Sequence, residues 1–105
     1  PERADVVWLD FSPQAGHEQA GRRPALVLSP FSYNQNGMAL VCPITSKIKG
    51  YPFEVIIKTD KINGVILSDH IKNYDWRARK LHFISKASLD VVNSVSKNIF
   101  SLLVK

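Results

Sequence analysis

Residues 25–30 read ALVLSP and residues 38–45 read MALVCPIT. Both are continuous apolar runs of the length of a β-strand, a pattern typical of strands that are buried on both faces. The segment between them ends in Asn36-Gly37, a dipeptide that is favoured where two strands are joined. The two runs therefore predict a pair of strands at the centre of a β-sheet.

Pro43 lies inside the second run, close to its end. A proline has no N–H group to donate to a neighbouring strand, so we expect strand pairing to be interrupted at this position. The interruption would leave Ile44 and Thr45 at a strand end or in a bulge. A hydroxyl group held at such a break has room to donate a hydrogen bond to a ligand.

Further strands are predicted on both sides of this central pair. Residues 5–11 are predicted to form a strand in which Val7, Leu9 and Phe11 share one face and Val6, Trp8 and Asp10 the other. Two more apolar runs flank a loop that ends in Asn63-Gly64, which predicts a hairpin. The predicted outer strands are residues 5–11, 53–58, 65–71 and 81–84, the last as a short edge strand.

The apolar spacing changes from Ser85 onward to steps of three and four, as in an amphipathic helix. Five or six short strands followed by one helix indicate an α+β domain, a small and partly open barrel with the helix covering one side. We expect a single domain over residues 1–105. The apolar stripe of the helix is predicted to be Leu89, Val92, Val95, Ile99 and Leu102.

Composition narrows the classes of function. The chain carries 14 Lys and Arg against 9 Asp and Glu, and the net charge of +5 favours a polyanionic partner such as nucleic acid or an acidic protein segment. The single cysteine, Cys42, excludes an internal disulfide framework and fits a reducing cytoplasm. His17, His70 and His82 show none of the close spacings of a zinc site, so we expect no metal. No apolar run approaches the about 20 residues needed to span a membrane, and no secretory signal is visible.

A polar segment rich in Gly and Pro, residues 12–24, follows the first strand and predicts a long loop. Long loops in compact domains are usually functional or disordered. A solvated, charged loop without function is the alternative interpretation. The segment combines candidate acids, bases and phosphate-binding groups, namely His17, Glu18, Gln19, Arg22 and Arg23.

Cleaving RNA without a metal ion requires three kinds of group. A base takes the proton from the 2′-hydroxyl, a cation stabilises the pentacoordinate phosphorane, and an acid protonates the departing 5′-oxygen. Glu18 or His17 is suited to the base. Arg23 offers a planar fork of donors that fits phosphate oxygens, and Thr45 offers a hydroxyl donor.

Two other segments contain candidate functional groups. Asp69 and His70 form a second possible acid and base pair at the end of a predicted strand. Trp76, Arg77 and Arg79 mix an aromatic ring with cations, a combination that stacks bases and holds phosphates. The same cluster also fits a core tryptophan beside an exposed basic turn.

The segment GHEQAGRRPALVLSP, residues 16–30, closely resembles the signature of the MazF/PemK toxins, also called Kid toxins, of bacterial type II toxin-antitoxin systems. The likeness extends from about residue 5 to the last helix. It continues through YN at 33–34, GM at 37–38, PIT at 43–45, KGYPFEV at 49–55, DH at 69–70 and WRAR at 76–79.

The resemblance implies a small SH3-like β-barrel of the MazF/PemK/CcdB type with a C-terminal amphipathic helix. It also implies a homodimer and an endoribonuclease activity without metal or cofactor. The expected reaction is sequence-specific cleavage of single-stranded mRNA, which leaves a 2′,3′-cyclic phosphate and a 5′-hydroxyl.

Carried over by position, the resemblance implies catalytic roles for Arg23, Thr45, Glu18 and His17, while Asp69 matches the base of some members. Leu67 stands where some members carry a second arginine, which favours Glu18 over Asp69 as the base but leaves both open. A guanidinium loses its proton only at very high pH, so we assign Arg23 to charge stabilisation and let His17 share the acid role. We expect substrate contacts from Arg22, Gln19, Lys49, Trp76, Arg77 and Arg79.

The resemblance further implies a cognate antitoxin with an acidic, disordered C-terminal segment, in a complex that binds operator DNA. Two alternatives remain, because fold alone does not decide function. Toxins of the CcdB type share the barrel and bind DNA gyrase without catalysis, and a non-catalytic RNA-binding barrel would keep the basic face. The set of Glu18, Arg23 and Thr45 favours the nuclease. The C-terminal SLLVK also lacks the aromatic-containing tail of the gyrase binders.

Overall fold

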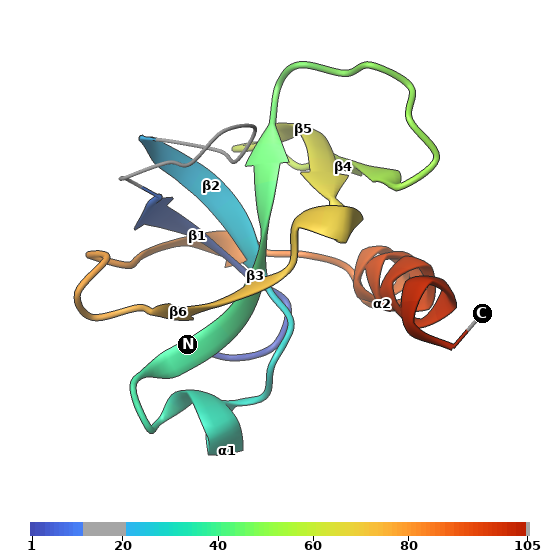
Figure 1. The fold of residues 1–105 in the computed structure, drawn as a ribbon. Coiled ribbons are helices and arrows are strands. Elements are labelled where there is room, and N and C mark those ends of the chain that lie inside the picture. Colours follow the sequence, from blue (N-terminus) through green and yellow to red (C-terminus); the bar gives the residue numbers. More distant parts are fainter. Residues whose placement is uncertain (12–20, 105) are drawn as a thin grey trace.

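Antiparallel strands form a curled sheet, and one long helix packs against its side (Figure 1). The computed structural model describes residues 1–11 and 21–104. Its helical elements are the short helix α1 (Phe31–Asn34), the 3-10 turn η1 (Ser68–His70) and the C-terminal helix α2 (Leu89–Leu103). Its strands are β1 (Asp5–Asp10), β2 (Arg22–Val27), β3 (Met38–Thr45), β4 (Glu54–Lys58), β5 (Asn63–Leu67), β6 (Lys72–Asp75) and β7 (His82–Lys86).

Strand β3 is the centre of the sheet because it pairs along both of its edges. The strands follow the order β4-β5-β3-β2-β1-β7, and β6 pairs with the first half of β3. On one edge β2 pairs with β3 up to Pro43, and on the other edge β6 pairs with it up to Val41 and β5 pairs with it from Ile44. Pairing with β2 therefore ends at Pro43, as predicted, and Ile44 and Thr45 form the end of β3.

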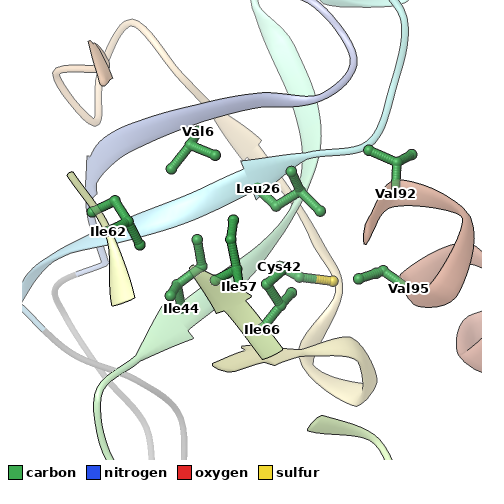
Figure 2. Packing of buried hydrophobic residues seen from close by; sticks show 9 residues of the cluster. All are labelled: Val6, Leu26, Cys42, Ile44, Ile57, Ile62, Ile66, Val92 and Val95. Atoms are coloured by element: carbon green, nitrogen blue, oxygen red, sulfur yellow. The ribbon is translucent and has the colours of Figure 1, made fainter. Parts of the chain in front are cut away.

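Two apolar clusters fill the two faces of the sheet. Successive residues of a strand point to opposite faces, so Val6 and Val7 of β1 belong to different clusters. The first cluster lies between the sheet and α2 (Figure 2) and contains Val6, Leu26, Cys42, Ile44, Ile57, Ile62, Ile66, Val92 and Val95. The second contains Val7, Leu9, Phe11, Ala25, Val27, Ala39 and Val41.

The α+β class, the curled sheet and the C-terminal helix confirm the architecture expected from the sequence. The run at 38–45 coincides with β3, and β4 and β5 form the expected hairpin. Strand β7 lies at an edge of the sheet, as predicted for the segment that begins at residue 81.

Several predicted boundaries are wrong. Strand β2 begins at Arg22, inside the segment that was expected to be a loop, because Arg22 and Arg23 pair with β1. The strand expected over 65–71 begins at Asn63 and ends at Leu67, where η1 turns the chain so that β6, which was not predicted, returns along β3.

The C-terminal helix begins at Leu89, later than the change of spacing at Ser85, because Ser85 still belongs to β7. The Ser88 side chain caps the helix by accepting a hydrogen bond from the Val91 amide at 3.2 Å. Two members of the predicted stripe are exposed, with 72% of Leu89 and 49% of Leu102 accessible. The buried stripe is therefore shorter and is centred on Val92 and Val95.

Candidate active site

Arg23 and Thr45 lie near the ends of β2 and β3 where pairing between the two strands stops. The two strands pair in the register that joins Ala25 to Pro43, Leu26 to Cys42 and Val27 to Val41. Continued by two residues, that register sets Arg23 opposite Thr45. The ladder with β2 ends at Pro43, before it reaches them, whereas β3 continues to Thr45 and pairs with β5 on its other edge. Arg23 and Thr45 therefore flank the place where the two strands separate.

The Thr45 hydroxyl is held by one hydrogen bond from the backbone. Its residue is only 7% exposed, and its Oγ1 accepts a hydrogen bond from the backbone amide of Lys47 at 3.2 Å. A hydroxyl that accepts one bond still has its own proton to donate. Thr45 pairs with Val65 of β5, so its backbone is held on the side away from β2.

Gly64 allows β5 to approach β3 this closely. A Cβ atom at position 64 would lie 2.4 Å from the carbonyl oxygen of Thr45, which is far inside van der Waals contact. Any side chain at this position would therefore displace the backbone of Thr45. The Asn63-Gly64 pair, which suggested a turn in the sequence, instead begins β5.

Arg22 and Arg23 are adjacent in β2 and so point to opposite faces of the sheet. Arg23 is partly buried and lies beside Leu9 of β1. Arg22 is exposed, and its Nη2 donates to the carbonyl oxygen of Lys80 and contacts Nδ1 of His82, both at 2.8 Å. The structure therefore brings only Arg23 to the side of the sheet that carries Thr45.

Three of the predicted site residues, His17, Glu18 and Gln19, lie outside the described residues. The segment that contains them connects β1, which ends at Asp10, to β2, whose first residues include Arg23. The chain therefore connects these three residues directly to the strand that carries the predicted phosphate-binding cation.

Asp69 lies in η1, four residues along the chain from Val65, the partner of Thr45. At roughly 3.3 Å per strand residue, this separates Asp69 from Thr45 by about 10 Å or more along β3. Asp69 is half exposed, and its Oδ1 lies 3.8 Å from Nε2 of His70. The predicted pair of Asp69 and His70 is thus together in space, but at a distance from the end of β3 within one protomer.

The buried Cys42 thiol is unsuited to nucleophilic chemistry. Burial, with a smaller contribution from the negative charge of Asp69, raises the pKa of Cys42 from 9.0 to about 12. The thiol stays protonated at neutral pH, whereas the thiolate is the reactive form. Cys42 is part of the apolar cluster shown in Figure 2.

Lys49 lies in the loop of residues 46–53, which joins β3 to β4 and which we name the β3–β4 loop (Figure 1). Its Nζ is 5.9 Å from the centre of the Tyr51 ring, and the tyrosine is 61% exposed. The sequence singled out Lys49 but missed Tyr51 and Glu54, although all three stand in the KGYPFEV stretch that carries the resemblance.

The segment of residues 72–80, which we name the β6 turn, carries the other predicted substrate contacts. Trp76 is partly buried against the second apolar cluster, and its Nε1 donates to the carbonyl oxygen of Asn34 at 2.8 Å. The guanidinium of Arg77 lies 4.9 Å from the centre of the Trp76 ring. That of Arg79 lies 4.8 Å from the Tyr74 ring and donates to the carbonyl oxygen of Asp10 at 3.0 Å.

Within residues 1–11 and 21–104, no three His, Cys, Asp or Glu side chains are grouped so that they could hold a metal ion. Over the same ranges, no helix has both the length and the apolar character required to cross a membrane.

Comparison with known proteins identifies the family. A sequence model described as the PemK-like, MazF-like toxin of type II toxin-antitoxin systems matches residues 2–103. The Escherichia coli (strain K12) protein named endoribonuclease toxin MazF is 52% identical over 80 residues, which cover 75% of this chain and 72% of that protein.

Solved structures agree with the sequence match. The crystal structure of MazF from Deinococcus radiodurans superposes with a TM-score of 0.94 at 50% identity, over 98% of this chain and 96% of that one. MazF in a MazE-MazF complex from the same organism superposes with a TM-score of 0.88 at 50% identity, over 98% and 95% of the two chains. The chain therefore belongs to the family of PemK-like, MazF-like toxins of type II toxin-antitoxin systems.

Proposed function

We propose that this protein is an endoribonuclease toxin that cuts single-stranded mRNA at specific sequences without a metal ion. The family assignment supports this proposal, as does the similarity to a protein named endoribonuclease toxin MazF. The observation that carries it is the register of β2 and β3, which sets Arg23 opposite Thr45 where the two strands part. A cation and a hydroxyl donor at one strand break suit a phosphodiester better than a protein partner.

The proposed reaction is attack of a ribose 2′-hydroxyl on the adjacent phosphorus. A bond forms between the 2′-oxygen and phosphorus, and the bond to the 5′-oxygen of the next nucleotide breaks. The products are a 2′,3′-cyclic phosphate and a 5′-hydroxyl. Arg23 stabilises the extra negative charge of the phosphorane, and the Thr45 hydroxyl donates to a non-bridging oxygen.

Two carboxylates are candidates for the base that takes the 2′-hydroxyl proton. Glu18 belongs to the segment that leads into Arg23, whereas Asp69 lies four residues along the chain from Val65, the partner of Thr45. Leu67 provides no cation beside Asp69. We therefore propose Glu18 as the base, with Asp69 as the alternative, and His17 as the group that protonates the departing 5′-oxygen.

Partners follow from the family. The Deinococcus radiodurans relative was solved in a MazE-MazF complex, and the net charge of +5 suits an acidic binding segment. We propose that a cognate antitoxin with an acidic, disordered C-terminal segment covers the RNA site in the cytoplasm. We further propose that the toxin is a homodimer and that the toxin-antitoxin complex binds operator DNA.

The test is cleavage of a defined transcript by the purified protein in excess EDTA, followed by mapping of both fragment ends. We expect cuts at a short recurring sequence, with cyclic phosphate on one side and 5′-hydroxyl on the other. The matched control is the same RNA with a single 2′-deoxy nucleotide at the cut, which should stay intact because it lacks the nucleophile. Intact RNA across several transcripts, or cleavage that EDTA abolishes, would contradict the proposal.

A further inference from the structure

Glu54, the first residue of β4, binds the backbone of the loop that precedes it. Its Oε1 accepts hydrogen bonds from the amides of Gly50 at 2.9 Å and Lys49 at 3.2 Å, and its Oε2 lies 3.3 Å from the Lys49 amide. Its own amide donates to the carbonyl oxygen of Tyr51 at 3.1 Å. The β3–β4 loop is thus folded around one carboxylate.

The backbone at Gly50 explains how two successive amides reach the same group. Gly50 has a φ of +79°, in the left-handed region that a residue with a Cβ atom rarely adopts. A left-handed residue next to a residue of ordinary handedness can turn their neighbouring N–H groups toward one point, which makes a small concave anion site. Here that site holds the carboxylate of Glu54, so the loop conformation depends on this side chain.

Among the described residues, Glu54 has no ion pair that competes with its hydrogen bonds to the loop. Its cross-strand neighbour in β5 is Leu67, and in the part of the chain that the structure describes no Lys or Arg side chain forms an ion pair with it. Carboxylates bind backbone amides through charge-assisted hydrogen bonds, which are stronger than neutral ones. Over residues 1–11 and 21–104, the hydrogen bonds of the carboxylate therefore all go to the loop.

The loop is fixed at both ends and exposed in between. Near its start, the Lys47 amide donates to Thr45 Oγ1, and near its end Glu54 holds Lys49 and Gly50. Between these contacts the loop presents Tyr51, 61% exposed, with the Lys49 ammonium 5.9 Å from its ring. An exposed ring beside a cation can stack a base and hold the adjoining phosphate.

We propose that Glu54 is a positioning residue, which holds the β3–β4 loop so that Lys49 and Tyr51 form a binding platform for a nucleotide next to the one cut at Thr45. This inference rests on the proposed function. It assigns to a carboxylate a favourable role in binding a polyanion, the opposite of what its charge alone would do.

The test compares Glu54→Ala and Glu54→Gln with Asp60→Ala, a matched control. Asp60 is exposed in the turn after β4, and its removal changes the net charge by the same amount. Charge alone would make both alanine variants bind RNA slightly tighter. We instead expect Glu54→Ala to raise KM for RNA about tenfold with kcat within about threefold. In this variant the free loop is no longer held, so RNA binding must also order it, which costs conformational entropy. Glu54→Gln should be intermediate, since its amide oxygen keeps one acceptor.

Hydrogen exchange provides a readout that is independent of RNA. In Glu54→Ala the amides of Lys49 and Gly50 should exchange faster than in the unmodified protein, while amides of β3 and α2 keep their protection. Unchanged exchange at these two amides would overturn the proposal that Glu54 holds the loop. Faster exchange with unchanged KM would overturn the proposal that the held loop forms the binding platform.

Failure of the proposed function gives a different pattern. If the unmodified protein does not cut RNA, binding of a fluorescent single-stranded oligonucleotide replaces KM as the measured quantity. Weaker binding by Glu54→Ala then supports the platform in the absence of cleavage. If the unmodified protein does not bind the oligonucleotide, both the binding platform and the proposed function are overturned. The exchange data then still show whether Glu54 holds the loop.

Discussion

The β3–β4 loop and the β6 turn both place aromatic rings beside cations, but the two regions use them differently. In the loop, Tyr51 is exposed and the backbone is held by Glu54, so the ring and Lys49 face solvent. In the turn, the Trp76 indole donates to Asn34 and the Arg79 guanidinium donates to Asp10. Side chains whose polar ends have backbone partners serve packing first, and an aromatic-cation pattern in sequence does not separate the two cases.

The largest effect should come from the strand break itself, next to the β3–β4 loop. Arg23→Ala should lower kcat/KM for RNA about a hundredfold or more, as does loss of a donor to a developing anion in other enzymes. Thermal unfolding and circular dichroism should show that the fold is kept. Turnover within a few-fold of the unmodified protein would remove Arg23 from the mechanism. The β3–β4 loop would then contribute more to RNA cleavage than the strand break does.

An intermediate effect is expected on stability in the β6 turn. Trp76→Phe keeps most of the ring but removes the N–H that bonds the Asn34 carbonyl, so unfolding free energy should fall by about 1 kcal/mol. Urea titration at fixed protein concentration measures this change. RNA cleavage at 25 °C should be unaffected. A loss of cleavage with unchanged stability would instead show that Trp76 stacks on RNA, as the sequence suggested.

The smallest effect is expected for Arg77→Ala. Arg77 is exposed and lies over the Trp76 ring, so its contribution to RNA binding is a screened surface attraction. We expect KM to rise by about threefold or less at physiological salt, and by more at low salt. This variant removes one positive charge, as Arg23→Ala does, and so serves as its charge-matched control. Equal losses in the two variants would show that only net charge matters.

The sequence predicted those parts of the fold that depend on local pattern. Most of the apolar run at 38–45 is buried in the sheet, although Leu40 is exposed, and its proline removes a donor whatever the partner strand is. The C-terminal helix shows its period in the spacing of Val92, Val95 and Ile99. In such cases the local signal and the tertiary structure agree.

The parts that were missed depend on distant partners. Arg22 and Arg23 belong to a strand only because β1 pairs with them, and β6 has four polar or half-buried residues that become a strand only against β3. The role of Glu54 was missed for the same reason, because its partners are backbone amides of a folded loop. The neighbouring positions of Arg23 and Thr45 follow from a register that no single segment encodes.

The lack of space around Gly64 bears on how loss-of-toxicity variants should be read. Any larger residue there must push the Thr45 carbonyl aside, and the hydroxyl moves with its backbone. A genetic selection for harmless variants will therefore return substitutions at position 64 alongside those at Arg23. The variants at position 64 would retain every group that we propose to contact the phosphate, and they would be inactive because Thr45 is misplaced.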